Sequence, residues 1–317
     1  MRSLVAIVAL LVAGCGTAPA QPESSPAVRV TPLGLDVPGI DLGAGLRLLA
    51  AYELTSSDPR FGGFSGIETD GRTLWLLSDR ASLWRATIAS GAGTGAEPLR
   101  LADWQALDLE RDAADRRALD SEALALDPAG NLLAGFEHDG SVRRLRANAD
   151  GSVAIERVTD EDLVDGASHN AGLEALAVWP DGTLIALSEG GRSAPGAAAG
   201  VTLEDGVASP FGYALGDGFS PVGAATAAGR VYVLERAVSV LGGWRSRLTV
   251  SPVEAMPING TLEGEAILTI SASPLGENYE GVALLKREGE GRLILLVADD
   301  NQSPLQRSLL LVLVEDG

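Results

Sequence analysis

The chain of 317 residues is poor in cysteine, histidine, aromatic side chains and basic side chains. Its single cysteine, Cys15, excludes a disulfide within the chain, and with only His138 and His169 beside it the usual zinc ligands are lacking. Lysine and arginine number 24 against 43 acidic residues, a formal charge of −19. Such a surface repels nucleic acid and anionic lipid and attracts cations, so we expect no nucleic-acid partner.

The first residues have the pattern of an export signal. A basic start at Arg2 precedes the apolar run Leu4–Val12, which is too short to span a bilayer. Val12-Ala13-Gly14-Cys15 follows, and it resembles the lipobox of bacterial lipoproteins. We therefore predict a signal peptide over residues 1–14 and lipidation, palmitate included, at Cys15. A plain secretory leader with an incidental cysteine is the alternative.

This start of the chain also predicts where the protein resides and how it is divided. Residues 15–42 are rich in proline, glycine and serine, which is typical of a flexible tether. We expect residues 43–317 to form one domain held at the periplasmic face of the outer membrane of a bacterial envelope. The lipid anchor is its only expected membrane contact, and the domain is expected to be monomeric.

A pattern of acid, hydrophobic strand, turn, second hydrophobic strand and acid recurs five times. The copies align at Ser65, Glu122, Glu174, Pro221 and Glu280, of which Ser65 and Pro221 replace the first acid. Intervals of 57, 52, 47 and 59 residues suit four-stranded propeller blades. We predict an all-β fold, a β-propeller of five four-stranded blades with a sixth possible. An open β-sandwich explains the strands but not the register of the acids.

The last copy is one strand short. Its third strand, Ser308–Val314, ends the chain, and the segment Leu46–Leu54 has the length of an outer strand. We predict that this N-terminal strand joins the last blade and closes the ring, which removes open sheet edges.

The recurring acids are predicted to meet at one mouth of a central channel, because antiparallel neighbours bring these strand ends together. Crowded carboxylates repel each other, so either several remain protonated or a cation lies among them. Oxygen ligands at this density suit Ca²⁺. The first-position acids are Glu122, Glu174 and Glu280; the second-position acids are Asp79, Glu137, Glu189, Glu235 and Asp299, followed by Asp300 and Asn301. From these we select as metal ligands Glu122, Glu174, Glu280, Asp299 and Asp300.

Three short motifs and one longer run resemble the phytase-like domain family, known as "esterase-like activity of phytase". They are Asp120-Ser121-Glu122-Ala123-Leu124, Asn170-Ala171-Gly172-Leu173-Glu174-Ala175-Leu176, Tyr279-Glu280-Gly281-Val282, and the run from Ala298 to Leu311. The resemblance spans roughly residues 46–315. It implies a β-propeller that hydrolyses phosphate or carboxylic esters, with a small anionic ester or phosphoester as substrate.

A mechanism follows from the charges. A Ca²⁺ ion held by the acids can bind an ester oxygen and acidify a bound water, with Glu189 or Glu137 as general base. His138 is either a general acid or an exposed turn residue. Arg80 and Arg236 either bind phosphate or neutralise the crowded acids. Two other functions remain open: a gluconolactonase-like Ca²⁺-dependent lactone hydrolase, and a non-catalytic envelope binding protein stabilised by Ca²⁺.

Overall fold

The computed structural model describes residues 27–89, 98–109, 119–160, 162–164, 172–239, 242–257, 259–271, 273–286 and 291–316. The predicted signal peptide and Cys15 lie outside these ranges. Apart from one 3₁₀ turn, η2 (Val253–Ala255), the regular elements in these ranges are strands, which confirms the all-β class. No helix in these ranges is long and apolar enough to cross a membrane.

The described strands form four sheets. The first has the order β1 (Val28–Pro32), β3 (Leu46–Ser56), β23 (Leu309–Glu315), β22 (Arg292–Asp299) and β21 (Asn278–Lys286). The second has the order β4 (Phe64–Thr69), β5 (Thr73–Ser78), β6 (Ser82–Ile88), β7 (Leu101–Leu109), β11 (Ser152–Arg157), β10 (Ser141–Ala147), β9 (Leu132–Phe136) and β8 (Ser121–Leu126).

The other two sheets come from the second half of the chain. One has the order β12 (Leu173–Val178), β13 (Leu184–Ala194), β14 (Ala197–Glu204), β15 (Val207–Ala214) and β19 (Thr261–Leu262). The other has the order β16 (Ser220–Ala227), β17 (Arg230–Ser239), β18 (Gly243–Pro252), β20 (Glu265–Ser271) and β2 (Ile40–Leu42). The neighbouring strands β19 and β20 therefore belong to two different sheets.

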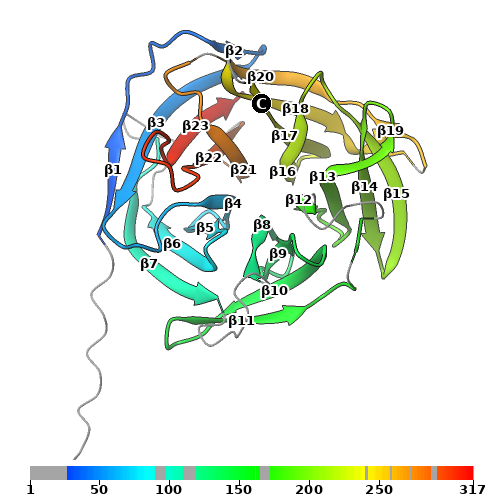
Figure 1. Cartoon of the computed structure of the whole chain (residues 1–317), viewed down its shortest axis with the longest axis horizontal. Helices are drawn as coiled ribbons and strands as arrows, with labels where there is room; N and C mark the ends of the chain where they lie inside the picture. The colour runs from blue at the N-terminus through cyan, green and yellow to red at the C-terminus, as the bar shows by residue number, and fades with distance from the viewer. Residues whose placement is uncertain are drawn as a thin grey trace, which may run out of the picture.

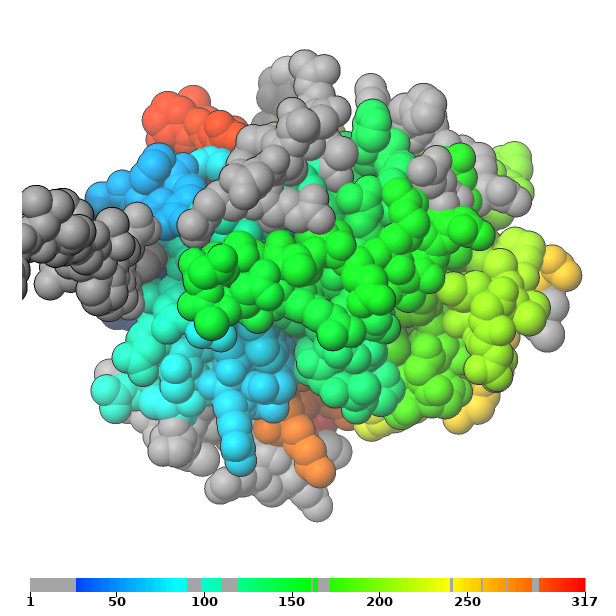
Figure 2. Space-filling view, turned by 90° about the horizontal axis from the view of Figure 1, so that it is seen from below, coloured from blue at the N-terminus to red at the C-terminus, as the bar shows by residue number. Residues whose placement is uncertain are grey.

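The sheets are arranged around a central axis, in the manner of a propeller (Figure 1). Five strands lie innermost, namely β4, β8, β12, β16 and β21, and each contacts the next around the axis, with β21 again beside β4. In the view turned by 90°, cyan, green and yellow-green segments follow one another across the near side, as they do around the axis (Figure 2). The eight-stranded sheet covers two sectors of this ring, joined where β7 and β11 pair in parallel.

The strand β3, from the N-terminal part of the chain, lies beside the last strand, β23. β3 pairs antiparallel with β23, from Leu46 opposite Glu315 to Glu53 opposite Leu309. β1 then pairs with β3, and β2 pairs with β20. Residues 28–32 and 40–42, inside the expected tether, thus form strands that cover sheet edges that would otherwise be open.

Hydrophobic side chains fill the spaces between neighbouring sectors. Among the described residues they form five clusters, each shared by two adjacent sectors of the ring. In one of them, Phe64 and Trp84 pack with Leu310 and Val312 of β23. The core thus lies between the sheets and leaves their inner strand ends available for polar side chains.

Each innermost strand carries a β-bulge at the same level. The pairing with the second strand skips one residue in all five, and these residues are Ser65, Glu122, Glu174, Val222 and Glu280. A bulge leaves its extra residue out of the ladder and re-aims its side chain. In four of the five copies the aligned repeat position is the bulge residue. In the remaining copy the aligned position, Pro221, precedes the bulge residue Val222 by one residue.

A small residue follows each bulge: Gly66, Ala123, Ala175, Gly223 and Gly281. A Cβ atom on Gly281 would lie 2.9 Å from the backbone nitrogen of Ile67 and 2.8 Å from Cγ1 of Val297. On Gly223 it would lie 2.7 Å from the carbonyl oxygen of Glu280. These glycines therefore let the innermost strands approach closely enough for the bulge residues to converge.

We predict that Gly281→Ala destabilises the fold by about 1–3 kcal/mol, because the added methyl group overpacks the contact between β21 and β4. Gly34→Ala is the matched control, since Gly34 is exposed and has no atom within 4 Å of the added Cβ. Urea unfolding of both variants measures the difference. Equal midpoints for the two would contradict the close packing of the inner strands.

Candidate functional site

The bulge residues form the lower of two polar levels at one end of the inner strands. The upper level comes from the second strands. In four of the five sectors, backbone pairing places one residue of the second strand opposite the residue two positions before the bulge. These pairs are Asp79 with Gly63, Glu137 with Asp120, Arg236 with Ser220, and Asp299 with Asn278. Glu189 follows Ser188, which pairs with Leu173, and so occupies the same level. The upper level thus consists of Asp79, Glu137, Glu189, Arg236 and Asp299.

The fourth second-position residue is a cation, and the prediction of Glu235 there is wrong. Glu235 pairs with Pro221 one residue earlier, and a slip of one residue turns a strand side chain to the other face. Glu235 is fully buried between the sheets, where it accepts hydrogen bonds from the hydroxyl of Tyr213 and from Nε of Arg247. The mouth therefore contains one arginine among its acids.

Arg236 neutralises one side of this mouth. Its Nη1 donates to Oδ1 of Asn278 at 3.0 Å and also to Glu280, and its Nη2 donates to Oε1 of Glu189 at 2.8 Å. Asn278 in turn donates from Nδ2 to Oε1 of Glu280 at 2.7 Å. Burial raises the pKa of Glu280 to about 7, against the opposing effect of Arg236. The residues predicted as metal ligand, general base and phosphate-binding group are here bound to one another.

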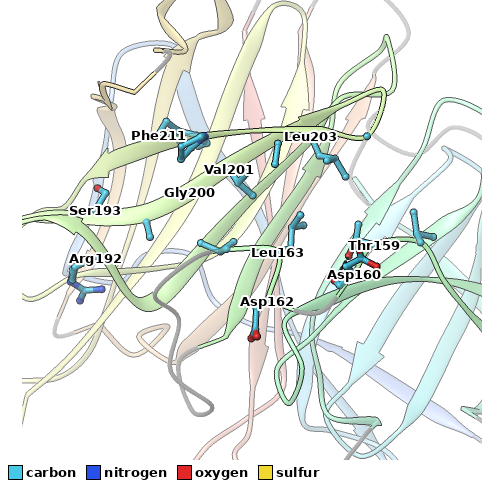
Figure 3. A pocket seen from close by; sticks show the side chains of 16 residues that line it. Thr159, Asp160, Asp162, Leu163, Arg192, Ser193, Gly200, Val201, Leu203 and Phe211 are labelled. Atoms are coloured by element: carbon cyan, nitrogen blue, oxygen red, sulfur yellow. Dashed lines mark hydrogen bonds between the residues drawn. The ribbon is translucent and has the colours of Figure 1, made fainter.

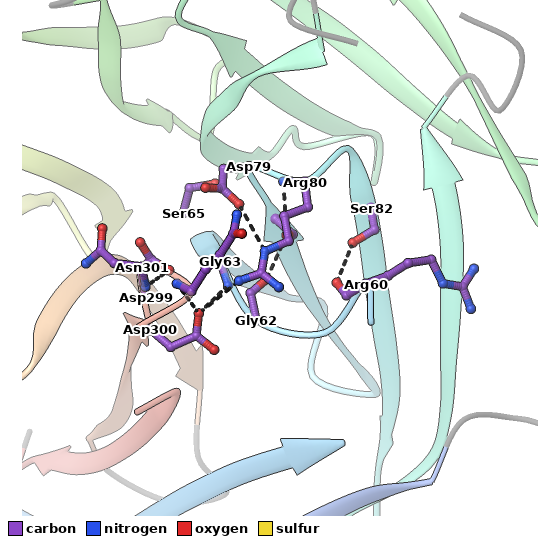
Figure 4. A network of polar contacts seen from close by, with 12 residues as sticks. Arg60, Gly62, Gly63, Ser65, Asp79, Arg80, Ser82, Asp299, Asp300 and Asn301 are labelled. Atoms are coloured by element: carbon purple, nitrogen blue, oxygen red, sulfur yellow. Dashed lines mark hydrogen bonds and ion pairs between the residues drawn. The ribbon is translucent and has the colours of Figure 1, made fainter. Parts of the chain in front are cut away.

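Arg80 and Asp300 form a second network, beside β4 and β5 (Figure 4). Asp300 Oδ1 accepts hydrogen bonds from Nη2 of Arg80 at 3.2 Å, the Gly63 nitrogen at 3.2 Å and the Gln302 nitrogen at 3.0 Å. Its Oδ2 accepts from the Ser308 hydroxyl at 3.2 Å. Asp300, predicted as a metal ligand, therefore ties three chain segments together.

Asp79 lies against this network with its charge poorly compensated. A Cβ on Gly63 would lie 2.1 Å from Asp79 Oδ1, and the φ of +62° at Gly63 is in the left-handed region that favours glycine. Oδ1 of Asp79 is buried and has no hydrogen-bond partner among the described residues; Arg80 Nε is 4.0 Å away. Burial, and then the charge of Asp299, raise the pKa of Asp79 to about 7.

The opposite side of the mouth has acids without a paired cation. One carboxylate oxygen each of Asp120, Glu122 and Glu137 lie within 4.8 Å of one another. No lysine or arginine of the described ranges forms an ion pair with these three or with Glu174. Burial raises the pKa of all four carboxyls, and repulsion from Glu174 and Glu280 adds to the effect at Glu122.

The donor set on this side suits a hard divalent cation. Three carboxylates from two adjacent strands supply only oxygen atoms, the ligands that Ca²⁺ and Mg²⁺ prefer. Glu122 and Glu174 are the predicted ligands that lie here, whereas Glu137 was predicted as a base. His138 follows Glu137 and is exposed, and its positive form lowers the pKa of Asp120 and Glu137.

Sequence reasoning missed two polar residues of the mouth, Asp120 and Asn278. Both occupy the position two residues before a bulge glutamate, in Asp120-Ser121-Glu122 and Asn278-Tyr279-Glu280. The bulge itself could not be recognised from the sequence, so it was not possible to predict that the side chains of these two residues point into the mouth. Their shared spacing from Glu122 and Glu280 was the available signal.

A groove lies away from the mouth, along β14, β15 and residues 158–160 and 162–164 (Figure 3). Its volume is about 640 Å³. The floor is formed by small and apolar residues such as Gly200, Val201 and Phe211, with Asp160, Asp162 and Arg192 as charged members. It contains none of the predicted site residues, so the mouth remains the candidate site.

Comparison with known proteins gives one family match and several likenesses of fold. The family described as "Phytase-like: Esterase-like activity of phytase" matches residues 59–302. No curated protein matches the chain. A gluconolactonase structure from Xanthomonas campestris is similar at 14% identity and a TM-score of 0.45, over 90% of this chain and 97% of that one. Virginiamycin B lyase from Staphylococcus aureus is similar at 10% identity and a TM-score of 0.39, over 91% and 99%.

We predict that Asp79→Asn changes how stability depends on pH when divalent cations are chelated. The folded state holds the Asp79 proton up to a pKa of about 7, whereas the unfolded state releases it near the ordinary value of 3.8. The stability that this group contributes is complete below about pH 4 and is lost as the pH rises to about 7. Thermal unfolding should therefore show that the stability of the variant relative to the wild type increases as the pH rises through this window. Above the window, the difference between the two proteins should stay constant. A constant difference from pH 4 to pH 8 would contradict the raised pKa.

Proposed function

The chain belongs to the Phytase-like family, and we propose that it is a divalent-cation-dependent hydrolase of ester or phosphoester bonds. The observation that carries the proposal is the division of the mouth into two halves. Arg236 compensates Glu189 and Glu280, whereas Asp120, Glu122 and Glu137 converge without a paired cation in the described chain. A divalent cation at the second half would complete the charge balance that Arg236 provides at the first.

The fold beneath this site is proposed to be a propeller of five blades. Five innermost strands contact in a ring, each with one bulge, and five hydrophobic clusters lie between the sectors. The eight-stranded sheet then counts as two blades, and the pairing of β3 with β23 closes the ring.

Asp120, Glu122 and Glu137 are proposed to hold the cation, with Glu174 beside them. Ca²⁺ is the expected ion, because a set of carboxylates at the ends of strands tolerates its variable coordination better than the octahedron of Mg²⁺. When bound, such an ion acts as a Lewis acid toward an ester oxygen and offsets the repulsion among the carboxylates. Assignment of Glu137 to the cation leaves Glu189 as the proposed general base.

Proton transfer is proposed to use the residues that flank this half of the mouth. Arg236 holds one oxygen of Glu189 at 2.8 Å, and the other makes no hydrogen bond to a described residue. Glu174 is buried, and burial with repulsion from Glu189 and Glu280 raises its pKa well above 4.5. It is therefore proposed as the group that donates a proton to the leaving group. Exposed His138 is the second candidate for this step.

The setting is proposed to be the bacterial envelope. The lipobox-like run before Cys15 supports a lipid anchor, and the acidic surface disfavours other contact with anionic membranes. We expect wild-type protein, but not Cys15→Ser, to incorporate labelled palmitate and to sediment with membranes. Equal labelling of both forms would contradict the anchor.

We predict that Glu122→Gln weakens cation binding and raises the Ca²⁺ concentration that hydrolysis requires. Removing one carboxylate ligand should weaken Ca²⁺ binding, and hydrolysis at limiting Ca²⁺, by about 10–100-fold. The measurements are calorimetric Ca²⁺ titration and hydrolysis of p-nitrophenyl phosphate, p-nitrophenyl acyl esters and lactones, with and without chelator. Glu204→Gln is the matched control, because Glu204 is exposed at the turn between β14 and β15.

These binding and hydrolysis measurements separate the proposed function from its two alternatives. Hydrolysis that chelation leaves unchanged would contradict the proposal. Activity confined to lactones would support the gluconolactonase-like alternative. Ca²⁺ that raises the melting temperature in the wild type but not in Glu122→Gln, without hydrolysis of any substrate, would identify a cation-stabilised binding protein.

A further inference from the structure

Arg245 lies just outside the mouth, on the third strand of its sheet. It pairs with Ala237 and precedes Ser246, which pairs with Arg236 of the mouth. β18 is separated from the innermost strand β16 by β17 alone. Adjacent strands are about 4.8 Å apart, so Arg245 starts roughly 10 Å from the innermost strand, at the same end as the acids.

Arg245 is held by an aromatic platform. The guanidinium carbon of Arg245 lies 5.1 Å from the ring centre of Phe219, and that of Arg247 lies 4.9 Å from the same ring. Gly216 lies against Arg247, where a Cβ atom would be 2.5 Å from Nη1. Stacking on a ring fixes the plane of a guanidinium group without using its hydrogen-bond donors.

The two arginines differ in their partners. Arg247 donates to the buried carboxylate of Glu235 at 2.5 Å. Arg245 forms no ion pair with any acid in the described part of the chain, and its Nε is buried without a hydrogen-bond partner. Asp217, in the same loop as Phe219, is exposed and makes no ion pair with it. Arg245 thus keeps a charge that no ion pair compensates, beside the paired Arg247, in a chain with 43 acidic and 24 basic residues.

We propose that Arg245 is an anion-binding subsite that takes a phosphate or carboxylate group of the substrate. Its buried Nε leaves the two terminal nitrogens as donors, and the end of a guanidinium group binds two oxygens of such an anion at once. The subsite rests on the proposed function in one respect: it selects substrates whose anionic group lies some distance from the bond that the mouth cleaves. Arg245 is a specificity residue in this scheme and takes no part in the bond cleavage.

Anion binding tests the subsite without any catalytic turnover. Calorimetric titration of the chelated full-length protein with inorganic phosphate, and separately with acetate, should show one site that Arg245→Met weakens at least tenfold. Arg245→Lys should retain part of the affinity as a point charge. Arg146→Met is the matched control, since Arg146 is exposed and paired with Glu156, and it should bind both anions as the wild type does. The anion that binds more tightly shows whether the subsite prefers a phosphate or a carboxylate group.

Substrate selection gives the second readout. The ratio of KM for an ester carrying a second anionic group to KM for its neutral analogue should rise about tenfold in Arg245→Met and stay constant in Arg146→Met. Phosphate and acetate titrations that match the wild type in both Arg245 variants would overturn the subsite. A protein that binds phosphate through Arg245 but hydrolyses no ester would retain the subsite and refute the proposed function instead.

Discussion

The structure depends on one repeated constraint, the β-bulge in each innermost strand together with the small residue that follows it. The bulge removes one residue from the ladder, and the glycine or alanine lets the next inner strand approach within contact distance. Buried carboxyls from distant parts of the chain therefore meet at one level around the axis. Repulsion and burial raise their pKa values, which means that the arrangement costs stability unless a positive charge accompanies it.

Among the described residues, that charge lies on one side only. Arg236 replaces an acid in the upper level and bonds Glu189, Glu280 and Asn278, while Arg80 and Asp300 tie the neighbouring segments. Asp120, Glu122 and Glu137 keep their mutual repulsion. Such an imbalance is typical of sites where stability is given up for binding, since the missing charge arrives with a ligand. The same asymmetry extends outward to Arg245, which forms no ion pair with a described carboxylate.

Sequence reasoning reached the all-β class and the approximate repeat positions because alternating strands, turn residues and recurring acids have clear signatures. It placed Glu122, Glu174 and Glu280 at equivalent points, and all three are bulge residues. It misplaced Glu235, because a shift of one residue between Glu235 and Arg236 reverses the face of a strand and no local pattern reveals it. The hydrogen bonds of Asp300 could not be foreseen for a related reason: its partners Gly63 and Arg80 come from a distant segment. Likewise, β1 and β2 are short strands whose pairing depends on edges formed far away in the sequence.

The position of a bound ion tests this account most directly. A crystal structure of the protein soaked with Mn²⁺, an oxygen-binding ion with a strong anomalous signal, would locate the charge that the mouth lacks. We expect the principal anomalous peak within about 2.0–2.6 Å of carboxylate oxygens from Asp120, Glu122 and Glu137. A mouth that takes up no ion, or an ion bound instead beside Glu189 and Glu280 with Arg236 displaced, would contradict the division into compensated and uncompensated halves.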